Sequence, residues 1–381
     1  MASRRVDAFE IDVPQSVIDD LDVRLRRTRW PDQIPGSGWT YGIDTPYLEN
    51  LASYWAQGYG WRNRERELNA LPQFRVELGG VGIHFIHAHG RGPSPVPLLM
   101  LHGWPSSFVQ FEKIIPLLTD PEAHGAVGAQ SFDVVVPSLP GFGFSDKPMQ
   151  PGFATRAIAE RMFELMSTLG YPRFGLRGSD VGGSVAQQMA LTRPADLIGL
   201  HVSGLLRGVP LLTPGKPPTL EEQRFLHDLQ VWTRTRMAYA SVQAQDPQTL
   251  AVGLNDSPAG LASWIIEKFQ FWGDTRVDLE RRFSRDDLLT NVMVYWVTQT
   301  IGSSVRLYHE FGHEKRLQGR VEVPTAVLMA QHDMVPVPRS VSERIYNVVR
   351  WSETPVGGHF LEWSEPELVA RDLRAFFSPP A

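Results

Sequence analysis

The chain has 381 residues, a net charge of −5 and no cysteine. It can therefore hold neither a disulfide framework nor a thiolate nucleophile, and its mixed charges form no basic stripe of the kind that nucleic acid requires. No apolar run approaches the roughly 20 residues of a membrane helix, and no secretory pattern is present. We expect a soluble, cytoplasmic protein without a membrane anchor.

The first 75 residues are rich in Trp, Arg and Pro and have no obvious core of their own. We expect this N-terminal segment to wrap around a catalytic core whose first part spans residues 76–205. Residues 74–78 and 82–86 are predicted to form antiparallel strands. Strands then alternate with helices, such as one over residues 156–169, and this alternation predicts a mostly parallel α/β sheet flanked by helices.

An apolar strand over residues 96–101 runs into His102-Gly103-Trp104-Pro105. The motif is either an ordinary turn closed by proline or part of an oxyanion hole, in which the backbone N–H groups of Trp104 and Val181 face the reacting centre. Its place two strands before the next motif favours the oxyanion hole.

That next motif, Gly178-Ser179-Asp180-Val181-Gly182-Gly183, has the form of a nucleophile elbow with aspartate where serine usually stands. Residues 173–177 are predicted to form the strand before it and residues 184–190 the helix after it. The tight turn needs small neighbours, which the glycines supply. The alternative is that Asp180 only caps the helix.

After a strand over residues 197–202 the pattern changes. Four prolines, Pro210, Pro214, Pro217 and Pro218, indicate a break, and helical stretches follow to about residue 310. We predict a helical cap over residues 206–310, with the second part of the core at 311–381. The apolar helix over residues 261–272 could line a pocket, although core packing is the default expectation, and residues 367–377 are predicted to form a final amphipathic helix.

Two further candidates follow strands in the second part of the core. Asp333 follows the C-terminal end of an apolar strand at residues 324–330. His359 lies in a glycine-containing loop after a short strand at residues 348–351. The order nucleophile, acid, histidine is the order of α/β hydrolases. We therefore predict a triad of Asp180 as nucleophile, His359 as general base and Asp333 as its charge-relay partner. Other histidines, namely His87, His89, His309 and His313, are expected at surface or helix positions.

With these motifs the chain resembles epoxide hydrolases of the α/β-hydrolase superfamily, in the branch of the microsomal and juvenile-hormone enzymes. The resemblance covers nearly the whole chain, including N-terminal motifs such as Arg29-Trp30-Pro31-Asp32. It implies two cap tyrosines that polarise the epoxide oxygen, matched well by Tyr308 and less closely by Tyr239. It also implies a small-molecule epoxide and water as partners, and dimers through the cap or N-terminal segment. The excess of arginine over lysine indicates a bacterial source.

The resemblance implies that Asp180 attacks an epoxide to give an ester, which water activated by His359 hydrolyses to a vicinal diol. No metal or organic cofactor is called for. The many aromatic residues favour apolar or aryl epoxides, in detoxification or secondary metabolism.

Three other functions are weighed against this one. A hydrolytic dehalogenase could use the same nucleophile, but such enzymes usually have a tryptophan directly after it, where this chain has Val181. A serine esterase would need its serine at the apex of the elbow, one position beyond Ser179. A catalytically inert binding protein of the same fold usually lacks a triad member, and here none is missing.

Overall fold

The computed structural model describes residues 5–204 and 217–378, and these residues form a nine-stranded sheet. The strand order is β1-β2-β3-β5-β4-β6-β7-β8-β9. Pairing is antiparallel from β1 to β5 and parallel from β5 through β4 to β9, as the alternating pattern predicts. The strands are β1 (Val6–Ala8), β2 (Gln73–Leu78), β3 (Val81–Ala88), β4 (Val96–Leu101), β5 (Phe132–Pro137), β6 (Phe174–Ser179), β7 (Leu197–Ser203), β8 (Val321–Ala330) and β9 (Tyr346–Thr354).

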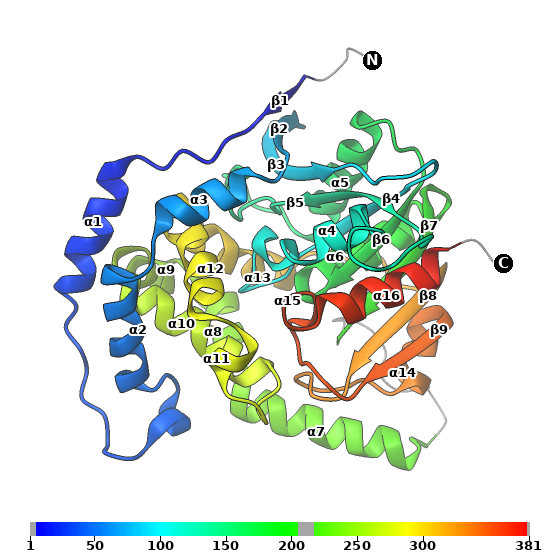
Figure 1. Ribbon diagram of the computed structural model, residues 1–381. Helices are drawn as coiled ribbons and strands as arrows, with labels where there is room; N and C mark the ends of the chain where they lie inside the picture. The colour runs from blue at the N-terminus through cyan, green and yellow to red at the C-terminus, as the bar shows by residue number, and fades with distance from the viewer. Residues whose placement is uncertain (1–4, 205–216, 379–381) are drawn as a thin grey trace.

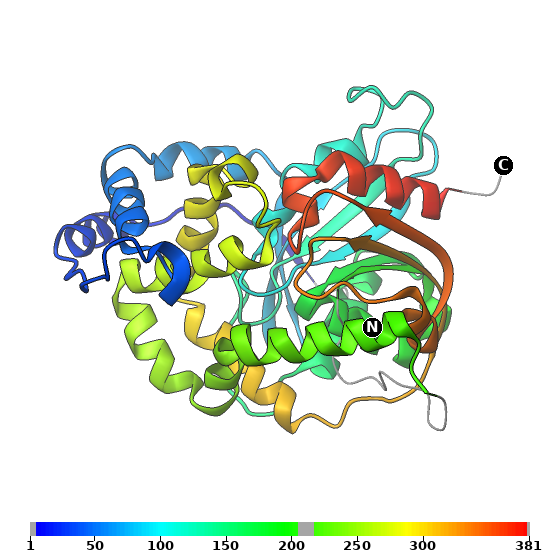
Figure 2. The ribbon, with the colours of Figure 1, turned by 90° about the horizontal axis from the view of Figure 1, so that it is seen from below.

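Helices cover both faces of the sheet. Helices α4 (Ile114–Thr119) and α16 (Pro366–Phe377) pack together on one face, and α5 (Thr155–Thr168) and α6 (Asp180–Thr192) on the other (Figure 2). The central strands are buried on both sides, which explains why their sequences read as continuous apolar runs rather than alternating ones.

A layer of helices is inserted between β7 and β8 and lies beside the sheet (Figure 1). Within it, α13 packs against α8 and α9, and α10 packs against α9 and α12. The predicted break at Pro210 and Pro214 lies outside the described residues, and the predicted domain boundaries remain predictions. The inserted helices are α7 (Leu220–Arg236), α8 (Ala238–Gln245), α9 (Pro247–Asp256), α10 (Pro258–Trp272), α11 (Leu279–Arg282), α12 (Arg285–Thr298) and α13 (Ile301–His313).

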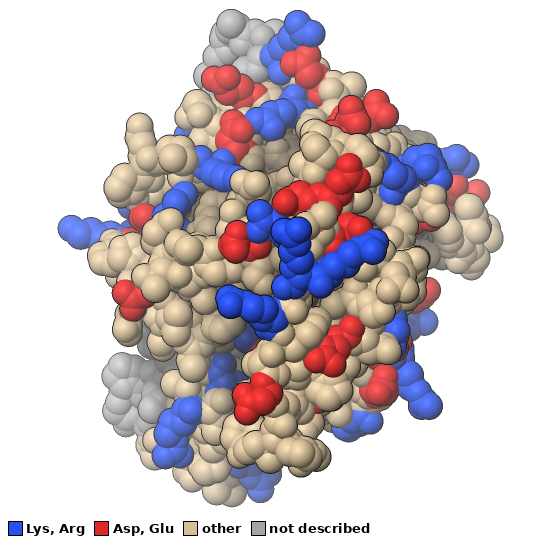
Figure 3. All heavy atoms as spheres, turned by 90° about the vertical axis from the view of Figure 1, so that its left-hand side faces the viewer, with Lys and Arg blue, Asp and Glu red and all other residues tan. Residues whose placement is uncertain are grey.

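The N-terminal segment contacts both the sheet and the helical layer. Strand β1 pairs with β2 at the sheet edge, whereas α1 (Gln15–Arg26) and α2 (Thr45–Gln57) pack against α10 (Figure 1). A third helix, α3 (Trp61–Asn69), leads back to β2. The face that includes α1 and α2 carries acidic and basic side chains side by side (Figure 3). No helix in the described part of the chain combines the length and apolar character needed to span a bilayer.

The expectation for His87 was wrong. His87 lies in β3, is buried and makes a 3.0 Å hydrogen bond to the Tyr171 hydroxyl. All residues of β3 are buried because the strand is covered on both faces, a situation that the local sequence does not reveal. His89 is largely exposed, and His309 and His313 lie on α13.

Candidate active site

Asp180 lies at the sharp turn between β6 and α6. Its φ of +51° falls in the left-handed region, which residues other than glycine seldom adopt. The turn is tight because a Cβ on Gly178 would lie 2.6 Å from the Gly182 carbonyl oxygen. The sequence therefore folds into the predicted elbow, which holds the carboxylate of Asp180 at the carboxyl end of the parallel strands.

Two backbone N–H groups bind the Asp180 carboxylate. The N–H of Trp104 donates to Oδ1 at 2.9 Å, and the N–H of Val181 also donates to the carboxylate. Gly103 permits this approach, since a Cβ there would lie 2.5 Å from the Cβ of Asp180. The turn after β4 and the elbow after β6 thus each direct one backbone donor at the same carboxylate, as the predicted oxyanion hole requires.

His359 contacts both aspartates of the predicted triad. Its Nδ1 lies 3.0 Å from Oδ1 of Asp333, in the turn after β8, and its Nε2 lies 3.6 Å from Oδ2 of Asp180. His359 itself follows β9 and precedes the short helix α15 (Leu361–Ser364). All three side chains come from the same edge of the sheet because the strands before them are parallel.

Charge dominates the protonation of this cluster. Burial opposes the charged imidazole, but the negative charges of Asp333 and Asp180 raise the pKa of His359 to about 10. Burial likewise opposes the ionised form of Asp180, yet the His359 imidazole and the N–H groups of Trp104 and Val181 hold the pKa of Asp180 below its usual value. The nucleophile candidate is therefore a carboxylate at neutral pH.

Both predicted tyrosines lie in the inserted helices and pack against Trp104. Tyr239 on α8 stacks on the Trp104 ring at a centroid distance of 5.4 Å, and Tyr308 on α13 meets the same ring edge-on at 5.8 Å. The two phenol rings are 5.9 Å apart and both are buried. Two helices far apart in the chain thus bring the tyrosines to one side of Trp104.

Trp272 belongs to this site, although the sequence analysis named only its helix as a possible pocket lining and not the residue itself. Its ring lies 5.0 Å from that of Tyr239 and 5.4 Å from that of His359, and its carbonyl accepts a 2.8 Å hydrogen bond from the His359 N–H. The close approach depends on Gly358, where a Cβ would lie 2.6 Å from the carbonyl carbon of Gly273. The only signal in the sequence is the end of an apolar helix at a glycine.

Within residues 5–204 and 217–378, no group of three or more His, Asp or Glu side chains is arranged to hold a metal ion. The described site brings together two carboxylates, an imidazole, two phenols and backbone N–H groups.

Comparisons with known proteins agree with the fold and the resemblance. Residues 6–111 match the family model for the epoxide hydrolase N terminus, and residues 96–366 match that for the alpha/beta hydrolase fold. A putative epoxide hydrolase of Stigmatella aurantiaca is 41% identical, over 98% of this chain and 84% of that protein. Epoxide hydrolase 1 of Oryctolagus cuniculus is 36% identical, over 97% of this chain and 88% of that protein.

Solved structures give the same picture. The juvenile hormone epoxide hydrolase of Bombyx mori superposes with a TM-score of 0.84 and 32% identity, covering 97% of this chain and 92% of that one. The epoxide hydrolase of Aspergillus niger superposes with a TM-score of 0.87 and 28% identity, covering 98% and 96%. The predicted fold is confirmed.

Proposed function

Because the chain belongs to the epoxide hydrolases of the α/β-hydrolase fold, we propose that it makes vicinal diols through a covalent ester on Asp180. The observation that carries this mechanism is the double contact of Trp104. Its N–H holds the Asp180 carboxylate, while its ring packs against both Tyr239 and Tyr308. An epoxide placed beside Trp104 would meet a nucleophile on one side and two phenols on the other.

In the first step, Oδ2 of Asp180 attacks an epoxide carbon. Oδ1 is already held by the N–H group of Trp104, which favours Oδ2 as the attacking atom. The C–O bond of the ring breaks and its electron pair goes to the epoxide oxygen. Tyr239 and Tyr308 stabilise that oxygen by hydrogen bonds, and one of them supplies the proton.

The second step begins with a change in the basicity of His359. Esterification removes the negative charge of Asp180, one of the two charges that raise the pKa of His359. The imidazole then loses its proton more readily, and that proton restores the phenol that was deprotonated in the first step. The neutral imidazole can take a proton from water, while Asp333 keeps it oriented. Water attacks Cγ of Asp180, and the Trp104 and Val181 N–H groups stabilise the charge that develops on Oδ1. The Cγ–Oδ2 bond then breaks, and the diol leaves with the former Oδ2 and with the proton that His359 took from water.

We propose apolar or aryl epoxides as substrates, because the rings of Trp272, Tyr239 and Tyr308 pack against Trp104, whose N–H holds the carboxylate. Styrene oxide should have a clearly higher kcat/KM than 1,2-epoxypropane. Equal values for the two would contradict this substrate class while leaving the ester mechanism intact.

A single-turnover reaction tests the mechanism. Excess enzyme reacts with styrene oxide in ¹⁸O-labelled water, followed by mass spectrometry of the diol and of the Asp180 peptide. We expect label in the peptide and mostly unlabelled diol from the first turnover. Label that enters the diol directly would contradict the aspartyl ester, and absence of diol would favour dehalogenation or a binding role. Ser179→Ala is the matched control and should leave the labelling unchanged.

A further inference from the structure

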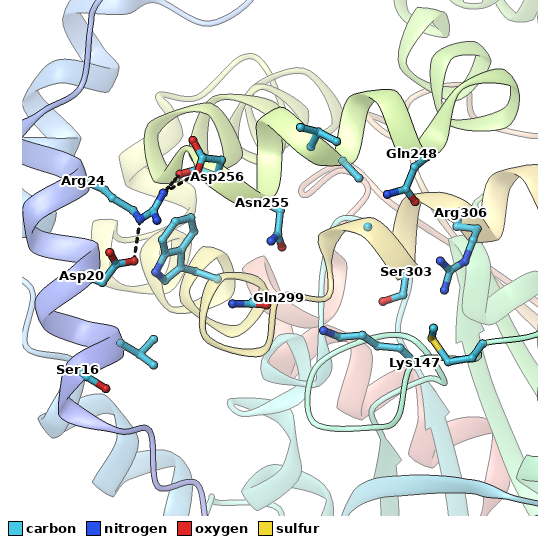
Figure 4. A pocket seen from close by; sticks show the side chains of 16 residues that line it. Ser16, Asp20, Arg24, Lys147, Gln248, Asn255, Asp256, Gln299, Ser303 and Arg306 are labelled. Carbon is cyan, nitrogen blue, oxygen red and sulfur yellow. Dashed lines mark hydrogen bonds and ion pairs between the residues drawn. The ribbon is translucent and has the colours of Figure 1, made fainter.

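A cavity of about 680 Å³ lies beside α13, apart from the candidate active site (Figure 4). It lies between α1, α9, α13 and the loop after β5, and none of the active-site residues described above lines it. Its volume is within the range of about 300–1,000 Å³ that is typical of small-molecule sites. The cavity is therefore large enough for a small ligand, and the charges of its lining indicate which kind.

One end of the cavity carries one excess negative charge. Arg24 on α1 forms ion pairs of 2.7 Å with Asp20 on the same helix and with Asp256 at the end of α9 (Figure 4). Its guanidinium lies 5.9 Å from the centre of the Trp296 ring, which also lines the cavity. Two carboxylates face one guanidinium here, so this end does not attract an anion.

The other end carries two cations without a counter-ion. Lys147 and Arg306 both line the cavity away from Arg24, and the Lys147 ammonium points toward Gln299 (Figure 4). In the described part of the chain, neither forms an ion pair with a carboxylate, and Arg306 donates only to the Pro148 carbonyl at 2.8 Å. Partial burial and the charge of Arg306 lower the pKa of Lys147. Two uncompensated cations beside a cavity favour the binding of an anion.

The space between the two ends is partly apolar. Val17, Val252 and Trp296 line it, together with the amides of Asn255 and Gln299 (Figure 4). Over the whole lining, three cations (Arg24, Lys147, Arg306) face two carboxylates (Asp20, Asp256), which leaves a single positive charge. A ligand with one negative charge would neutralise the lining, whereas a dianion would not.

We propose that this cavity binds a small monocarboxylate with an apolar chain, its carboxylate between Lys147 and Arg306 and its chain against Val252 and Trp296. The site is distinct from the active site and does not depend on the ester mechanism. Arg306 and Tyr308 lie two residues apart on α13, so one helix contributes to both sites.

Calorimetric titration of the full chain with octanoate tests the proposal. We expect saturable binding of one equivalent, weakened at least tenfold by Lys147→Met and retained by Lys147→Arg. Lys315→Met is the matched control, because it removes an exposed lysine that does not line this cavity, and it should leave the affinity unchanged. Thermal unfolding checks that Lys147→Met is folded; if it is not, Arg306→Gln takes its place.

Two comparisons of ligands complete the test. 1-Octanol should bind at least tenfold more weakly than octanoate, and octyl phosphate no more tightly. Equal binding of octanol would mean that the cavity recognises only apolar chains, and tighter binding of the phosphate would mean that it selects dianions. Either result, or octanoate binding unaffected by Lys147→Met and Arg306→Gln, would overturn the proposal.

Discussion

Two buried histidine–aspartate pairs lie at the sheet of this molecule, and they differ in the third group that each imidazole meets. His359 and Asp333 are 3.0 Å apart, and His201 and Asp372 are 2.9 Å apart. Beyond the first pair stands a carboxylate, that of Asp180, at 3.6 Å. Beyond the second stands a guanidinium: Nη1 of Arg177 lies 3.1 Å from Nδ1 of His201.

The third group sets the charge of each imidazole. The two carboxylates around His359 overcome burial and raise its pKa to about 10, whereas burial, together with the charge of Arg177, lowers the pKa of His201 against the attraction of Asp372. His201 is therefore a neutral link in a buried network, and His359 is an ion that loses its proton once Asp180 is esterified. A histidine–aspartate pair alone does not define a catalytic base.

The largest expected effect comes from His359→Gln. Loss of the general base should lower kcat by about 10²–10⁴-fold, and mass spectrometry of the trapped enzyme should show the Asp180 peptide still esterified, because the first step needs no base. His201→Gln is the matched control and should keep kcat within about twofold, since His201 touches no reacting group. An equal loss of kcat in the two variants would contradict the assignment of His359, and not His201, as the catalytic base.

Next in size is the effect of Arg177→Met on stability. Arg177 and Glu362 form a fully buried ion pair, and removal of one partner leaves the other charge uncompensated. We expect the free energy of unfolding, measured by urea denaturation, to fall by about 3–5 kcal/mol. Arg26→Met breaks an exposed ion pair with Asp22 and should leave the free energy of unfolding nearly unchanged. Similar losses in both variants would argue against a special role for the buried network.

Asp180→Ala should lower the pKa of His359 by about 1–3, because one of the two carboxylates is gone. The raised pKa of His359 stabilises the folded protein, and this stabilisation is complete at pH values below about 6.5, the pKa in the unfolded chain. It is lost as the pH rises through about 10, the pKa in the folded protein. In Asp180→Ala this stabilisation of the folded protein should be lost at a lower pH. Histidine NMR titration measures the shift; an unchanged pKa would assign the charge effect to Asp333 alone.

The smallest effect is expected for the stability of His201→Gln. Asp372 keeps its ion pair with Arg350 and Arg177 keeps Glu362, so both buried charges stay compensated. We expect a loss of about 1–3 kcal/mol for the hydrogen bonds removed, by the same urea measurement. A loss as large as that of Arg177→Met would mean that the imidazole, rather than the guanidinium, holds the network together.

The sequence predicted the elements that hold Asp180, Asp333 and His359, because each follows an apolar strand and parallel strands end at one edge of the sheet. It did not predict the His201 network. Arg177 and His201 are neighbours only through the register of β6 and β7, and Asp372 comes from the last helix. Trp272 was missed for a related reason: its place depends on the contact between Gly273 and Gly358, far apart in the chain.

That glycine contact also bears on how the molecule moves. The end of α10 is fastened to the loop of His359 by the hydrogen bond from the His359 N–H to the Trp272 carbonyl, and Arg282 of α11 pairs with Glu365 at 2.6 Å. We expect this part of the helical layer to stay fixed during turnover, so that substrate and diol pass on the side of α8 and α13. The amide hydrogen of His359 should then exchange with solvent as slowly as those of β4; fast exchange during turnover would instead place the opening at this loop.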